Sequence, residues 1–498
     1  MHGRDELFTL AAVATASLML AACRPGDEPR PSAPEPSTLR VGIGQVATSP
    51  GLGLRSVIEN LTLEQLATLS DDGRPRPALA KDWTVSSDGL ELTVNLSPGV
   101  TFHDGSALTG AVVANALQNT LRATMGPALE DVDGVTAPND QQVVVRFRRP
   151  SPFMLDSLEV FIQKRGPPAV GTGPFVPADP KSLTDLRANS QYHMGAPAID
   201  RIVVTSFPSV RSAWAELLRG RIDMLMDVGT DALDSLETSS QVSIFTYTRH
   251  YQYLVAFNSQ APVFKSPQVR RAVAMAVDKN ALVRDALNGR GLPSVGPVWP
   301  QNYAFRADFP TLPYSVEAAA AALAASGGQR QGNRLHFTCL VPPDAVNERL
   351  ALVLKQQLAA VGVDMSLEET SMDHIVDALK NRRFEAALLE GVSGPTLLRP
   401  YQLWHSKGAV HPGGLGSPKL DDALDKIRHA PSEAEYLGAV AAFQQTIVDD
   451  PPAVFLAWIQ RARAVTKRFV IPPVEQGRDV LSNLRLWKPT SDGPRTSH

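Results

Sequence analysis

The chain has 498 residues, of which 43% are hydrophobic and 20% charged, and its formal net charge is −3 at pH 7. These values are ordinary for a globular protein of roughly two to four domains. They exclude the broad basic field that recognises nucleic acids or anionic membrane surfaces, so we expect neither as a partner.

The first 22 residues resemble a signal peptide. Residues 7–22 (LFTLAAVATASLMLAA) carry no charge, but they are shorter than the roughly 20 apolar residues of a membrane span. The stretch ends in Leu-Ala-Ala directly before Cys23, which resembles the lipobox of bacterial lipoproteins, whose cysteine is lipidated. We expect residues 1–22 to be removed and Cys23 to carry lipid; the alternative is an ordinary signal peptide that contains a cysteine.

The next segment, residues 23–37, has five prolines, charges of both signs and no large apolar residue. This composition is typical of a disordered tether. Lipid on Cys23 would leave Cys339 without a partner in the chain, and the strand-like run around it (RLHFTCLVP) predicts a buried core residue. No later run of the sequence is apolar enough to predict a membrane span.

The folded part begins with a strand-rich stretch. Residues 39–43 predict a strand, and DWTVSSDGLELTVNLSPGVTF contains two alternating runs around Asp88 and Gly89, which predict a hairpin. The run SALTGAVVANALQNTLRA, by contrast, repeats apolar residues at helical spacing. We therefore expect strands with one helix.

Two later stretches alternate strands with helices. A strand at 199–206, a helix that begins near Ser209 and ends at Gly220, and a strand at 222–228 predict a parallel pair in an α/β sheet. A helix from Ser266 to Gly289, with Pro267 at its first position, opens the second such stretch.

The second stretch continues in the same way. Its elements are a helix at 318–325 closed by Gly327, a helix ending at Gly362, a strand, a helix from about Asp373 and a strand at 385–390. The tail VLSNLRLWKPT predicts a further strand that pairs with an earlier segment. Together the patterns predict an α/β fold with two lobes, joined near 256–258 and separated by a cleft.

Motifs for catalysis are weak. GIGQVA places Gly42, Gly44 and Ala47 as in a dinucleotide site, but the Pro and Gly residues that follow favour a loop. His103 and Asp104 fit a turn better than a metal site, and His405 with His411 lacks a third ligand. The hydrolase and nucleotide-binding patterns G-x-S-x-G, S-x-x-K, H-E-x-x-H and G-K-[ST] do not occur. The sequence thus favours binding over catalysis, with no cofactor and no metal.

Several segments, in order, resemble the family 5 solute-binding proteins of bacterial ABC transporters, which include oligopeptide-, dipeptide- and nickel-binding proteins. They are DGRPRPALAKDWTVSSDGLELTVNLSPGVTFHDGSALTGAVVANAL, VGTGPF, AIDRIVV with ELLRGRIDM, YLVAFNSQAPVFKSPQVRRAVAMAVDKNALV, and SPKLDDALDKIR with DDPPAVFLAW. They span residues 61 to about 458.

The resemblance implies a periplasmic-binding-protein-like fold whose two lobes close around a solute and deliver it to an ABC permease. It implies a monomer in the periplasm or at the outer face of the cytoplasmic membrane, anchored here through Cys23. The implied parts are a first lobe of 38–53, 169–256 and 464–490, its strand-rich subdomain at 54–168, a second lobe at 257–463 and a tail at 491–498.

By position in the family pattern, the ligand should contact residues on both sides of the hinge. These are Tyr251, Tyr253, Glu390, Arg399, Tyr401 and Trp404. The large side chains between residues 397 and 408 fit the lining of a cleft, although packing of Tyr401 and Trp404 beneath this loop-like stretch is an equal alternative.

The sequence departs from its relatives in one respect. Peptide binders of the family carry an aspartate after the second-lobe strand for the ligand's α-ammonium, whereas EGVSGPTLLRPYQLW has none after Glu390. Burial of an ammonium without a counter-charge is costly. Either Glu390 takes the place of the missing aspartate or the ligand lacks a free amine. The ligand can therefore be a peptide, a metal chelate, haem, an opine or an oligosaccharide. A ligand-sensing receptor is a rival function, and a secreted enzyme a weaker one.

Overall fold

The computed structural model describes residues 37–490 apart from 45–51, 165–169, 180–181, 230–232, 234–235, 327–329, 332–333, 409–414 and 476–477. The predictions for the leader, Cys23, the tether and the tail at 491–498 lie outside the described residues, as do Ala47, Gly327 and His411. No helix within the described ranges has the length and apolarity needed to cross a membrane.

The predicted α/β class is confirmed by a mixed sheet of 12 strands. One part of it comprises β1 (Thr38–Gly44), β10 (Phe175–Asp179), β11 (Ser182–Ala188), β12 (Arg201–Phe207) and β13 (Met224–Leu225), with helices α1 (Leu52–Thr62) and α3 (Val210–Leu218). β12 and β13 are both parallel to β1, which lies between them. The prediction that the strands flanking α3 pair directly is therefore wrong, because the N-terminal strand inserts between them.

The strand-rich unit (residues 54–168) contains a four-stranded antiparallel sheet in the order β5-β6-β8-β7. Its elements after α1 are β2 (Glu64–Gln65), β3 (Ala67–Leu69), β4 (Pro75–Pro77), β5 (Ala80–Val85), β6 (Glu91–Leu96), α2 (Gly110–Met125), the 3₁₀ helix η1 (Gly126–Asp131), β7 (Val132–Asn139), β8 (Gln142–Phe147), the 3₁₀ helix η2 (Pro152–Glu159) and β9 (Phe161–Ile162). The predicted hairpin is confirmed: Gly89, with a φ of 71°, turns β5 into β6.

The second part of the large sheet contains β17 (Arg334–Val341), which is parallel to both β18 (Val363–Glu369) and β19 (Ala386–Val392). The other elements of residues 262–449 are η3 (Pro262–Phe264), α5 (Pro267–Met275), α6 (Lys279–Ala286), β15 (Gly291–Pro293), α7 (Val316–Ala325), β16 (Arg330–Gln331), α8 (Ala345–Ala360), α9 (Met372–Lys380), α10 (Leu398–Trp404), α11 (Pro418–Arg428) and α12 (Glu433–Asp449). As predicted, Cys339 is core: it is 1% exposed, and burial raises its pKa to about 12.

Three sequence expectations fail in this region and at the C-terminus. The helix expected up to Gly289 is two helices, because the side chain of Asp278 caps a new one, α6. The stretch expected as a loop around Tyr401 is helix α10. The tail forms mainly a 3₁₀ helix, η4 (Val480–Leu486), and only β22 (Lys488–Pro489) pairs, with β21 (Phe469–Val470).

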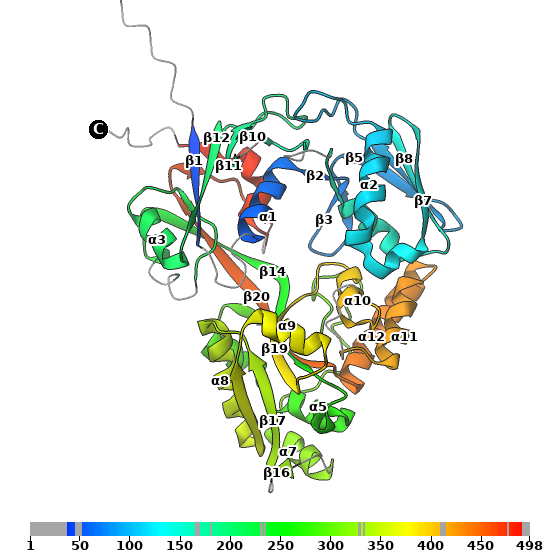
Figure 1. The fold of residues 1–498 in the computed structure, drawn as a ribbon, viewed down its shortest axis with the longest axis vertical. Coiled ribbons are helices and arrows are strands. Elements are labelled where there is room, and N and C mark those ends of the chain that lie inside the picture. Colours follow the sequence, from blue (N-terminus) through cyan, green and yellow to red (C-terminus); the bar gives the residue numbers. More distant parts are fainter. Residues whose placement is uncertain are drawn as a thin grey trace, which may run out of the picture. The chain divides into compact units, whose positions relative to one another are not determined.

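Two long strands join the parts of the sheet. β14 (Val242–Phe257) and β20 (Ala453–Thr466) run antiparallel side by side (Figure 1). β13 pairs with the last residues of β20, whereas β19 pairs with the last residues of β14. Both groups of strands therefore depend on this one pair, and the predicted junction at 256–258 lies at the end of β14.

The strand-rich unit shares a hydrophobic core with elements that follow β19. Leu66, Phe153 and Leu158 belong to the same cluster of buried residues as Trp404 and Phe455. The division of the chain into the lobes and subdomain given above stays a prediction, but this core shows that the strand-rich unit packs on α10 and its neighbours.

A buried ion pair crosses the same contact. Asp131, 1% exposed, accepts hydrogen bonds from Arg428 Nε and Arg149 Nε, both 2.6 Å away, and Arg428 Nη1 donates to the Tyr401 hydroxyl at 2.6 Å. Burial alone would raise the pKa of Asp131, but contacts with His429, Arg428 and Arg149 outweigh it and hold that pKa well below its usual range.

We expect Arg428→Met to lower the free energy of unfolding by about 3–5 kcal/mol, because it leaves a buried carboxylate with incomplete compensation. Urea denaturation followed by circular dichroism measures the change. The matched control is Arg146→Met, which breaks an exposed pair with Glu91 and should cost less than about 1 kcal/mol. Equal losses in the two variants would contradict the role assigned to Arg428.

Candidate functional site

Three adjacent strands bring charged and aromatic side chains together at the middle of the large sheet. Tyr253 of β14 lies opposite Glu390 of β19, and Tyr247 of β14 lies opposite Arg461 of β20. The pairing of β14 with β20 shifts register between Thr248 and Gln252. Such an irregularity re-aims side chains, and it falls on the stretch that carries Arg249 and Tyr251.

We call Arg249, Tyr251, Tyr253, Glu390 and Arg461 the hinge cluster. Glu390 Oε1 lies 3.9 Å from Arg249 Nη1 and 3.7 Å from Arg461 Nη2, so both arginines pair with one carboxylate at distances too long for hydrogen bonds. The guanidinium of Arg249 also lies over the Tyr251 ring, 4.0 Å from its centroid.

Both arginines keep donors for another partner. Their side chains are 35% and 23% exposed for Arg249 and Arg461, and Nε of Arg461 is buried without a hydrogen-bond partner among the described residues. Burial disfavours the charge on Arg461, but the carboxylates of Asp227 and Glu390 outweigh it and raise the pKa of Arg461 further above its usual range. The cluster thus holds two guanidinium groups with unused hydrogen-bonding capacity, opposed by Glu390 and, at Arg461, also by Asp227.

Three of the six residues predicted to bind ligand lie in this cluster. Tyr251 is half-buried and Glu390 is exposed, so both can reach a solute. Tyr253 is only 4% exposed, and burial raises its pKa to about 12. Tyr253 is therefore packed within the protein and is less able than Tyr251 or Glu390 to contact a solute.

The other three predicted residues lie on α10. Tyr401 and Trp404 are 0% exposed: Tyr401 stacks on His405 and accepts from Arg428, and Trp404 packs edge-on against Phe455. Their surroundings match the packing alternative. Arg399 donates to Gln402 within the same helix.

Arg399 also lies near two acids of η2, the buried Asp156 and the half-buried Glu159. Asp156 is 4% exposed and accepts a hydrogen bond of 2.5 Å from the Thr396 hydroxyl. Burial raises the pKa of Asp156 to about 7 and that of Glu159 to about 8, although Arg399 lowers both. The segment that lacks an aspartate of its own thus contacts a carboxyl group supplied by the strand-rich unit.

The weaker motifs have structural roles. His103 Nε2 lies 3.0 Å from the Gly173 carbonyl oxygen, and Asp104 accepts from Lys164 and Ser106 in a turn. In the described part of the chain, no three His, Cys, Asp or Glu residues are grouped so that they could hold a metal ion.

Sequence reasoning missed Arg249 and Arg461. Each is a charged residue inside a long, mostly apolar strand, in TYTRHYQYLVAF and AWIQRARAV. That pattern was a usable signal, because a strand with buried faces rarely carries arginine without a specific partner. The pairing with Glu390, by contrast, depends on which strands are neighbours.

Comparison with known proteins finds a matching family model and similar sequences. The model of the bacterial extracellular solute-binding proteins, family 5 (middle), matches residues 74–409. The oligopeptide-binding protein AppA of Bacillus subtilis is 24% identical over 474 residues, which cover 86% of each chain.

Solved structures show the same fold. The ABC transporter substrate-binding protein CtaP of Listeria monocytogenes superposes with a TM-score of 0.80 at 20% identity, over 91% of this chain and 99% of CtaP. NikZ of Campylobacter jejuni, solved in complex with Ni(L-His), gives a TM-score of 0.76 at 20% identity over the same shares. The predicted two-lobed architecture is thereby confirmed.

We expect the pair Asp156 and Glu159 to make the protein less stable as pH rises from about 5 to 8. Their folded pKa values lie above the ordinary values, so the folded state retains protons that the unfolded state releases in this window. In the double variant Asp156→Asn/Glu159→Gln, the loss of unfolding free energy between pH 5 and pH 8 should be smaller than in the wild type by on the order of a few kcal/mol.

Urea denaturation at pH 5 and pH 8 measures this effect. The control Asp308→Asn changes an exposed pair with Arg306 and should keep the wild-type slope. An unchanged slope in the double variant would show that the two carboxyl groups ionise normally in the folded protein.

Proposed function

The chain belongs to family 5 of the bacterial extracellular solute-binding proteins, and on that premise we propose that it captures a peptide-like solute at the hinge cluster and delivers it to an ABC permease. The fold supports this, as do relatives with peptide-binding names. In this proposal the chain binds and releases its solute unchanged and is not an enzyme.

One observation carries the choice of ligand: two partly exposed arginines lie beside Glu390 and keep guanidinium donors that this carboxylate does not engage. Arg249 and Arg461 both lie within 4 Å of Glu390, yet neither is hydrogen-bonded to it. A carboxylate of a solute can accept two parallel hydrogen bonds from a guanidinium, which is the strong, directional form of this contact. We propose that the solute's carboxylate binds here.

The same geometry bears on the solute's amine. Glu390 is the carboxylate that the sequence suggested for an α-ammonium, but its charge is already opposed by two guanidinium groups. An ammonium placed beside it would also face those two positive charges. Recognition through the solute's carboxylate therefore fits the cluster better than recognition through its amine.

The position of the hinge cluster links solute binding to closure of the two lobes in our proposal. β14 and β20 carry Arg249 and Arg461 and belong to both groups of strands. In our proposal a solute on these strands makes further contacts that exist only when the two lobes approach, so binding shifts the population towards the closed form. The permease then recognises that form.

Two alternatives to this function remain. In the first, the solute is not a peptide but a nickel chelate, an opine, haem or an oligosaccharide. Relatives with such ligands in their names include a haem-binding protein of Haemophilus influenzae and NikZ in complex with Ni(L-His). A receptor that presents its liganded surface to a membrane partner is the other, and dependence of solute uptake on the permease separates it from an importer.

We also propose that the protein is held at the outer face of the cytoplasmic membrane, or in the periplasm, by lipid on Cys23. The Leu-Ala-Ala-Cys sequence and the Pro-rich tether support this.

Free di- and tripeptides should raise the melting temperature of the wild-type protein, whereas their C-terminal amides should raise it little. Ligand at 100 times its dissociation constant stabilises a fold by about 2.7 kcal/mol. N-acetylated peptides, nickel–histidine, haem and oligosaccharides complete the panel for differential scanning fluorimetry. A response to amides equal to that of the free acids would exclude carboxylate recognition.

Arg461→Met should weaken the binding of an active peptide about 10- to 100-fold, because it removes a charge-assisted hydrogen bond worth about 1.5–3 kcal/mol. Isothermal titration calorimetry measures it. Arg122→Met, on the exposed side of α2, is the matched control and should bind as the wild type does.

Cys23→Ser should abolish incorporation of radiolabelled palmitate and move the protein from the membrane fraction to the soluble fraction of expressing cells. Cys339→Ala is the control, because Cys339 is buried in the core, and it should retain the label. Labelling that survives in Cys23→Ser would exclude Cys23 as the anchor.

A further inference from the structure

A hollow of about 180 Å³, lined by none of the residues of the hinge cluster, lies where α6 begins and α12 ends. We call it the Lys279 pocket. Its walls are formed by Ala274, Val277, Asp278, Lys279, Asn280, Pro293, Val295, Thr311, Leu312, Tyr314, Ile447, Val448, Pro451, Ala453, Val454 and Phe455. Most of these side chains are apolar, and a cavity of about 150 Å³ already suffices to hold benzene.

Lys279 is the cationic group of this pocket. Its Nζ donates one hydrogen bond, of 2.7 Å, to the Ser294 carbonyl oxygen. Burial lowers the pKa of Lys279 to about 8, and no carboxylate of the described residues contributes to this shift. An ammonium has three donors, so Lys279 retains donors for an anion.

The neighbouring acid, Asp278, is not paired with Lys279 and serves as a helix cap. Oδ1 of Asp278 accepts from the Ala281 amide at 2.9 Å and thereby caps α6. The Ser294 carbonyl that orients Lys279 is itself held in place, because the Ser294 hydroxyl donates to Gln252 and Gln252 donates to Ser393, all three being at most 1% exposed. The ammonium is therefore fixed at one end of an apolar hollow.

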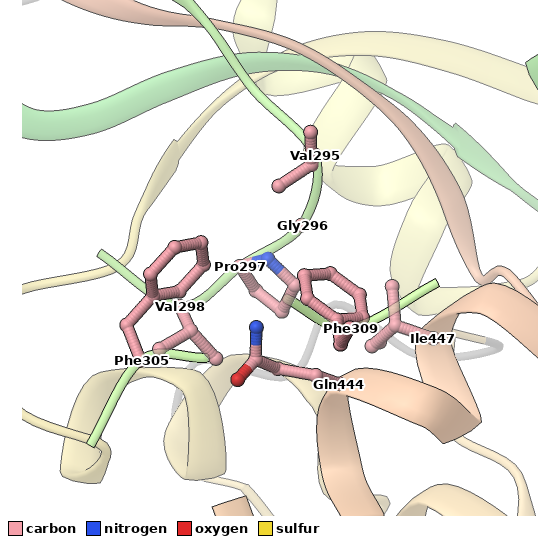
Figure 2. A pocket seen from close by; sticks show the side chains of 8 residues that line it. All are labelled: Val295, Gly296, Pro297, Val298, Phe305, Phe309, Gln444 and Ile447. Atoms are coloured by element: carbon pink, nitrogen blue, oxygen red, sulfur yellow. The ribbon is translucent and has the colours of Figure 1, made fainter. Parts of the chain in front are cut away.

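The apolar surface continues beyond the pocket. A smaller hollow shares Val295 and Ile447 with it and extends to Phe305 and Phe309, whose rings stand on either side of Pro297 in Figure 2. The surface thus changes from the ammonium of Lys279 in the larger hollow to apolar side chains in the smaller one. A ligand that matches it has a negative head and an apolar body.

We propose that the Lys279 pocket is a second binding site, which takes a small monocarboxylate with an apolar body about the size of a benzene ring. The carboxylate pairs with the ammonium of Lys279, and the body replaces water against Leu312, Ile447 and Phe455. This site shares no residue with the hinge cluster, so it goes beyond the solute capture proposed above.

Benzoate and its neutral analogue benzamide test the proposal on the full chain by isothermal titration calorimetry. At pH 7 benzoate should bind at least tenfold more tightly than benzamide. Between pH 7 and 9.5 its affinity should fall about thirtyfold as Lys279 loses its proton; the other ionisable groups of the pocket are Asp278 and Tyr314. Equal binding of the two probes, or no binding of benzoate at tens of millimolar, would overturn the proposal.

A variant locates the site. Lys279→Met keeps the length of the side chain without its charge and should lose at least tenfold in benzoate affinity, whereas Lys355→Met, on the exposed side of α8, should bind as the wild type does. Circular dichroism verifies that both variants are folded. Undiminished benzoate binding by folded Lys279→Met would refute the site, and the pH profile of the wild type decides the matter if that variant does not fold.

Discussion

The antiparallel pairing of β14 with β20 is the constraint on which the rest of the structure depends. The two strands pair from Val242 with Thr466 to Ala256 with Ala453, and the other strands of the large sheet attach on either side of them. β14 reaches this position from the middle of the chain and β20 from near its end. The backbone hydrogen bonds between two distant segments therefore hold together both groups of strands and the side chains between them.

Buried charges connect the strand-rich unit to the helices after β19. Asp131 pairs with Arg428 across this contact, and Asp156 accepts from Thr396. The two acids differ in compensation: Asp131 has three cationic or potentially cationic neighbours, whereas Asp156 has one hydroxyl donor and a more distant Arg399. Burial favours the neutral form of both acids, but the donors around Asp131 lower its pKa below the usual range, whereas the pKa of Asp156 stays raised.

The side chains of the hinge cluster are brought together by the order of the strands. Glu390 lies on β19 and Arg461 on β20, and neither strand pairs with the other; β14 lies between them and contributes Arg249. Family resemblance placed Tyr251, Tyr253 and Glu390 near the ligand, but it carried no information on the two arginines that compensate Glu390. In our proposal their charge makes the cluster better suited to a carboxylate than to an amine.

The sequence by itself determined most elements and the fold class, because hydrophobic periodicity and capping residues are local properties; the hairpin at Gly89, the cap at Ser209 and the buried Cys339 are examples. It also determined the family, through an ordered set of segments. Only the tertiary structure decided that β1 separates β12 from β13, that Tyr401 and Trp404 are core, that Arg461 lies beside Glu390, and that Lys279 lies in a mostly apolar hollow. These facts depend on contacts between residues far apart in the chain, and no local pattern encodes which distant side chain will be the neighbour.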